Sequence, residues 1–192
     1  MERLLKAKHW QIFLVTIGLP FILQIIIMPV SIFTGNPMLL FKLMPVIMVV
    51  FMAGFFGWFW SIAIGLQTKI PVSVKMKVEK FKIFFFIPLV YIFLISIFFG
   101  FIGSWIEGGS NPGPGRIGLI MGVIVPLHLF SMFCIFYCLY FVAKTFKTVE
   151  LQKEVTFSDF GGEFFLFWFF PIGVWIVQPK INKFVEGDQH LD

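Results

Sequence analysis

Four long apolar runs without Asp, Glu, Lys or Arg restrict the folds that this chain can adopt. They cover residues 10–33, 43–66, 83–106 and 117–143. An α-helix rises about 1.5 Å per residue, so each run is long enough to cross a hydrocarbon core of roughly 30 Å. The sequence therefore predicts an all-α fold, a polytopic bundle with four full transmembrane spans. We expect residues 1–192 to form a single membrane-embedded domain.

The composition excludes an ordinary soluble domain. Only 13% of the 192 residues are charged and 59% are hydrophobic, whereas soluble domains carry about 25% charged residues. The net charge of +5 comes from cations between the apolar runs, a pattern that fits membrane topology and anionic headgroups better than nucleic acid. We therefore expect the lipid bilayer as a partner, with anionic headgroups near the Lys-rich loops, and no nucleic acid.

The distribution of cations predicts the orientation of the spans. Three segments on one side of the predicted membrane carry many cations: the N-terminus has Arg3, Lys6 and Lys8, residues 67–82 have five Lys, and residues 144–163 have three. The two loops on the other side, residues 34–42 and 107–116, carry one cation each. Cytoplasmic loops are the ones enriched in Lys and Arg. The N-terminus is therefore predicted to be cytoplasmic, and the residues 144–163 to lie along the inner face.

A fifth apolar segment, residues 164–178, is too short to cross the bilayer as a simple helix. It is apolar all round, unlike a helix lying on the membrane surface. Two arrangements remain: a short span, or a re-entrant element that turns at Pro171 to Gly173. The re-entrant arrangement is favoured because it leaves Lys180 and Lys183 on the cytoplasmic side.

Small residues at helical spacing mark the predicted contacts between spans. In lipid, helices associate through close backbone approach at Gly, Ala and Ser. Residues four apart share one helix face. Three sets have this spacing and are predicted to be packing surfaces: Gly57, Ser61 and Gly65; Ser96 and Gly100; Gly118 and Gly122.

Polar residues inside the spans suggest one candidate intramembrane site. His128 is the only ionisable side chain deep in a predicted span, and Ser131 lies on the same side of that helix. Thr16 and Gln24 form a second polar stripe in the first span. Intramembrane polar residues are either functional or simple hydrogen-bonding contacts between helices, and the second interpretation is favoured here. Cys134 and Cys138 lack a recognised ligand spacing, so the sequence predicts no metal site, no cofactor and no catalytic residue.

Two segments carry a resemblance to known proteins. LKAKHWQIF (Leu5 to Phe13) and SDFGGEFFLFWFFPIGVWIVQPKINK (Ser158 to Lys183) resemble small, uncharacterised multi-pass membrane proteins of Bacteroidota-type bacteria, for which no activity is assigned. The resemblance implies a bacterial inner membrane. Abundant packing residues and sparse reactive ones favour a non-enzymatic accessory, packing or homo-oligomeric membrane subunit. The alternatives are a small transporter or channel with a polar site between spans 1 and 4 and, less favoured, a lipid-modifying or intramembrane enzyme.

Overall fold

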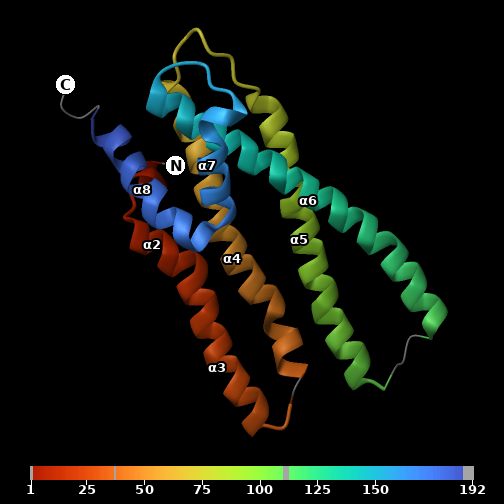
Figure 1. Ribbon diagram of the computed structural model, residues 1–192. Coiled ribbons are helices and arrows are strands. Elements are labelled where there is room, and N and C mark those ends of the chain that lie inside the picture. Colours follow the sequence, from red (N-terminus) through yellow and green to blue (C-terminus); the bar gives the residue numbers. More distant parts are fainter. Residues whose placement is uncertain (1, 37, 110–112, 188–192) are drawn as a thin grey trace.

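A computed structural model describes residues 2–36, 38–109 and 113–187, which contain helices and no strand (Figure 1). Four helices in this part of the chain are long and apolar enough to cross a membrane. They are α2 (His9–Phe13) continued through the π-helical η1 (Leu14–Gly18) into α3 (Leu19–Phe33), then α4 (Met38–Gly65), α5 (Val78–Glu107) and α6 (Pro114–Leu151). The predicted all-helical fold with four helices of spanning length is thus confirmed.

Three helices are several residues longer than their predicted spans, among them α5, which begins at Val78 rather than residue 83. α4 begins at Met38 rather than residue 43, and α6 continues past residue 143 to Leu151, where Gln152 adopts a left-handed conformation. The stretch expected to lie along the membrane surface is therefore partly helix. The reason is burial: Thr145, Phe146 and nearby residues of this extension are buried against other helices, and such packing stabilises a helix beyond what its hydropathy predicts.

The long helices form two hairpins, α3–α4 and α5–α6, that lie close together at one end and splay apart at the other (Figure 1). We call the close end the packed end, because α1 (Glu2–Leu5), α7 (Phe157–Trp168) and α8 (Phe170–Glu186) also gather there. α4 is central and contacts α1, α3, α5 and α6. Residues 110–112, within the loop predicted between the third and fourth spans, lie outside the described residues.

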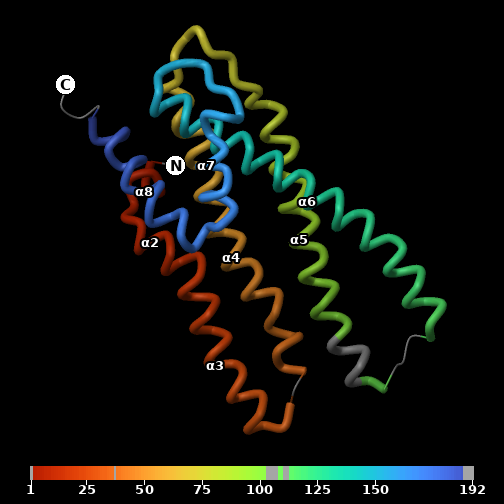
Figure 2. The backbone as a smooth tube through the Cα atoms, viewed as in Figure 1, coloured from red at the N-terminus to blue at the C-terminus, as the bar shows by residue number. Residues whose placement is uncertain are grey.

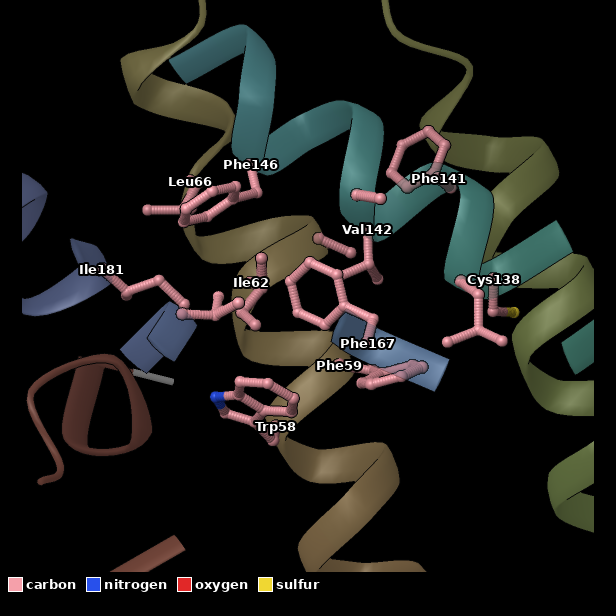
Figure 3. Packing of buried hydrophobic residues seen from close by; sticks show 14 of the residues in the cluster. Trp58, Phe59, Ile62, Leu66, Cys138, Phe141, Val142, Phe146, Phe167 and Ile181 are labelled. Atoms are coloured by element: carbon pink, nitrogen blue, oxygen red, sulfur yellow. The ribbon is translucent and has the colours of Figure 1, made fainter. Parts of the chain in front are cut away.

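The hydrophobic core occupies the packed end (Figure 3). Trp58, Phe59 and Ile62 of α4 meet Phe146 of α6 and Phe167 of α7 there, all with no exposed surface. In the splayed half, large apolar side chains are exposed instead, among them Ile32 (69%), Leu119 (75%) and Val123 (62%). Exposed apolar side chains along a spanning helix face lipid, so only the packed end has a protein-like interior.

α7 and α8 form a helical hairpin whose two ends both lie at the packed end (Figure 2). The helices are separated at Phe169, which has non-helical dihedral angles (φ −84°, ψ 58°). Pro171 and Gly173, predicted to form the turn, instead lie in the first turn of α8. Proline suits that place because the first helical N–H groups need no partner within the helix. Gly173 is needed because a Cβ there would collide with the Leu166 carbonyl of α7.

Candidate functional site

His128 forms a polar pair with a residue that the sequence analysis did not single out. Its Nδ1 lies 3.2 Å from the hydroxyl oxygen of Tyr91 on α5, and the two ring centroids are 5.8 Å apart. His128 is otherwise exposed on the surface of α6. The pair links α5 to α6, a structural contact of the kind that joins membrane helices.

Of the other predicted polar residues, Ser131 lies three residues from His128 on α6, whereas Thr16 and Gln24 lie in the first span. Ser131 is buried on α6. Thr16 is buried in η1 against α4, where a Cβ at Gly54 would be 2.9 Å from the Thr16 Cα. Gln24 is exposed on α3, and α3 lies on the far side of the bundle from α6 (Figure 1). Among the described residues, no hydrogen bond joins Thr16 or Gln24 of the first span to His128 or Ser131 of α6.

The most extensive buried hydrogen bonding instead surrounds Gln178 of α8, which has no exposed surface. Its Oε1 accepts a hydrogen bond from Trp58 Nε1 at 2.7 Å. Its Nε2 lies within hydrogen-bonding distance of three backbone carbonyls, those of Leu4 (3.2 Å), Leu5 (3.0 Å) and Ala7 (2.9 Å). We call this group the Gln178 centre. It joins the N-terminal segment, α4 and α8 in one place.

Asn182, one helical turn along α8, completes this attachment of the N-terminal segment. Its Nδ2 donates to the Leu5 carbonyl at 2.9 Å and lies 3.2 Å from the Ala7 carbonyl. These carbonyls belong to the bend between α1 and α2 and need donors from outside their own helices. The amides of Gln178 and Asn182 supply them, and so fix the path of the N-terminal segment across α4 and α8.

The small residues of α4 receive this same N-terminal segment. A Cβ at Gly65 would lie 2.6 Å from Leu5 Cδ1, and one at Gly57 would lie 3.5 Å from Leu4 Cδ1. Ser61, between them, is buried and donates to the Trp58 carbonyl at 2.8 Å. The set predicted to contact another span therefore accommodates α1 instead, because the N-terminal leucines fill the space that glycine leaves.

The remaining predicted packing residues divide into two groups. On α5, Ser96 is buried, and a Cβ at Gly100 would lie 3.3 Å from Pro45 Cγ of α4. On α6, Gly118 and Gly122 are exposed, and a Cβ at either would have no neighbour within 4 Å. The first pair lies where α4 and α5 pack. The second lies on a helix surface that no other described residue covers.

Four charged side chains join α6, α7 and α8 at the packed end. Lys147 Nζ lies 2.7 Å from Glu150 and 2.8 Å from Glu163, and Lys180 Nζ lies 2.8 Å from Glu150. Lys147 and Glu163 are largely buried, with side chains 18% and 13% exposed. Equal numbers of cations and anions make the group neutral, which partly buried charges require. It holds the α7–α8 hairpin against the end of α6.

Sequence reasoning passed over Gln178, Asn182 and Trp58. The available signal was the amide pair in VQPKIN at the end of an otherwise apolar segment, since buried amides need partners. Within the described ranges, no three His, Cys, Asp or Glu residues are grouped to hold a metal ion, and Cys134 and Cys138 are buried thiols. The Gln178 centre consists of amide, indole and carbonyl groups, which bind and orient a backbone.

Comparison with known proteins adds no further assignment. No protein-family model, curated protein or solved structure matches this chain.

Proposed function

We propose that the protein is a multi-pass protein of a bacterial inner membrane whose N-terminus and packed end face the cytoplasm. The Lys-rich segments, the N-terminal cations and the ends of the α7–α8 hairpin all gather at the packed end, as the positive-inside rule requires of a cytoplasmic side. The hairpin is then re-entrant. Its tip carries exposed apolar side chains, including Trp168 (47%), Phe169 (58%) and Ile172 (62%), which would rest in hydrocarbon.

Within that membrane the protein acts as a non-enzymatic subunit of a helical assembly, held together through the outer half of α6. The observation that carries this proposal is the exposure of that half-helix. Residues 113–130 are exposed apart from Ile120 and Ile124, which are partly buried. A spanning helix in a finished bundle normally has one side covered by protein. Here the side that bears Gly118 and Gly122 has no covering helix among the described residues.

A second copy of the chain is the partner that fits this surface. Copies inserted in one membrane share the same orientation, so two α6 helices related by a two-fold axis would meet as a parallel pair. Parallel helices with glycines four residues apart approach closely and pack backbone against backbone. Gly118 and Gly122 of each copy would then lie against those of the other, and each copy would cover the other's exposed half-helix.

Disulfide cross-linking in native membranes tests the proposal. The background replaces Cys134 and Cys138 by Ser, and single cysteines are then introduced at Gly118 or, as a control, at Ile32 near the corresponding end of α3. We expect oxidation to give a covalent dimer with Gly118→Cys and little with Ile32→Cys. Adding Gly122→Ile to the Gly118→Cys chain should remove most of the dimer. Equal cross-linking of both cysteines, or none at either, would refute assembly through α6.

A further inference from the structure

An apolar groove of about 470 Å³ runs between α4 and α5, and none of its lining residues belongs to α6. Phe56 and Met52 of α4 line one wall, and Phe85 and Leu89 of α5 line the other. Leu4, held over α4 by the hydrogen bond from Gln178 to its carbonyl, lines it as well. Small-molecule sites in proteins have volumes of about 300–1,000 Å³, so this groove is large enough for a ligand.

The length of the groove matches one leaflet of a bilayer. Its lining on α4 extends from Val49 to Ser61, which is about 18 Å along a helix. Half of a hydrocarbon core is about 15 Å. Beyond the groove, toward the splayed end, α4 and α5 come together where Pro45 meets Gly100. The groove therefore runs from the packed end toward the middle of the membrane and stops there.

Two cations, Lys82 and Arg3, lie close in the sequence to residues that line the groove. Lys82 lies three residues before Phe85 and seven before Leu89, so it is on the same face of α5, about one turn closer to the packed end. Its Nζ lies 2.6 Å from Glu79, but both side chains are exposed (39% and 83%), where such a pair is readily exchanged for another anion. Arg3 directly precedes Leu4 and is also exposed.

Trp60 adds a further feature of a lipid-facing mouth. It lines the groove beside Ser61, and its ring packs on Phe85 with centroids 4.9 Å apart. Tryptophan is enriched at the level of lipid headgroups, because its ring is apolar while its N–H is polar. The order of these features along the groove matches a phospholipid. The cations correspond to the phosphate, Trp60 to the glycerol level and the apolar groove to an acyl chain.

We propose that this groove binds one acyl chain of an anionic glycerophospholipid from the leaflet at the packed end, with the phosphate at Lys82 and Arg3. The acyl chain lies along Met52, Phe56 and Leu89, and these side chains then contact the bound lipid instead of bulk lipid. This site is independent of the α6 surface, so the failure of one proposal leaves the other standing.

Native mass spectrometry of the intact protein with added lipid tests the proposal. The probes are phosphatidylglycerol and, as the lipid without net charge, phosphatidylethanolamine. Ala53→Phe places a ring in the groove, and Val90→Phe places the same ring on an exposed position of α5 outside it. We expect one phosphatidylglycerol to remain bound to the wild type and to Val90→Phe. Ala53→Phe should lower its retention at least about tenfold.

The headgroup contact is tested separately with Lys82→Gln. One Lys near an anionic lipid surface changes binding by about 1 kcal/mol, so phosphatidylglycerol retention should fall about fivefold. Phosphatidylethanolamine has the same phosphate but no net charge, so its retention should fall less. Leu89→Trp fills the groove from the α5 wall. If thermal denaturation shows that Ala53→Phe does not fold, phosphatidylglycerol retention is measured with Leu89→Trp instead and should fall in the same way. Unchanged retention in a folded groove-filling variant, or equal retention of the two lipids by the wild type, would overturn the proposal.

Discussion

Replacing Gln178 by Leu should detach the N-terminal segment from the bundle. The change leaves Trp58 Nε1 without its acceptor, and a buried donor without a partner costs about 1–3 kcal/mol. The carbonyls of Leu5 and Ala7 still accept hydrogen bonds from Asn182. The N-terminal segment therefore loses close to one net hydrogen bond, which is worth about 0.5–1.5 kcal/mol. The sum is about 1.5–4.5 kcal/mol, which favours the detached segment by roughly 10- to 2,000-fold.

Cysteine labelling measures this detachment. Ala7→Cys, in a chain whose two native cysteines are Ser, is partly buried when the segment is attached. We expect a hydrophilic maleimide to label it much faster after Gln178→Leu. Gln24→Leu is the matched control, since Gln24 is exposed on α3, and this variant should leave the labelling rate unchanged. Equal labelling rates in Gln178→Leu and wild-type protein would refute the role assigned to the Gln178 centre.

Two further predictions concern the α7–α8 hairpin. Gly173→Ala should lower the stability of the protein by about 1–3 kcal/mol, because the new Cβ collides with the Leu166 carbonyl. Gly162→Ala on α7 is the control and should have little effect, since a Cβ there has no neighbour within 4 Å. Equal melting temperatures of the two variants would refute the close approach of α8 to α7 at Gly173. The backbone N–H of Thr156, and to a smaller extent its hydroxyl, donate hydrogen bonds to the Asp159 carboxylate and hold the pKa of this carboxyl below its usual range. The ionised Asp159 therefore stabilises α7 fully above about pH 4, and this stabilisation is lost as the pH falls through the folded-state pKa. Circular dichroism between about pH 6 and 2 measures this loss of helix. Asp159→Asn should lack the part of the acid transition that comes from protonation of Asp159, and a transition identical to that of the wild type would contradict the prediction.

The spanning helices were predictable because the property that defines them is local. Each apolar run is visible in a short window of sequence, and a run in hydrocarbon must be helical to satisfy its own backbone. The exact ends were less predictable. α6 continues through Lys147 and Glu150 because Glu163 of α7 and Lys180 of α8 neutralise those charges, and neither partner is near them in the sequence.

The small residues show what a pattern predicts and what it leaves open. Spacing of four places Gly57 and Gly65 on one face of a helix, but spacing carries no information about which residue fills that face. The structure places Leu4 and Leu5 there. The same spacing at Gly118 and Gly122 meets no neighbour among the described residues. Packing depends on the position of other chain segments, and a single helix pattern does not contain that position.

The sequence by itself determined the four helices that are long and apolar enough to cross a membrane, because hydropathy is a sum over neighbouring residues. Only the tertiary structure decided where the N-terminal segment and the C-terminal helices pack. Gln178 bonds to Leu5 across 173 positions of sequence. The short apolar segment, for which the sequence left a re-entrant element and a short span open, lies around the turn of the α7–α8 hairpin. Such contacts form only when the whole chain is folded, since they satisfy polar groups that each helix alone leaves without partners.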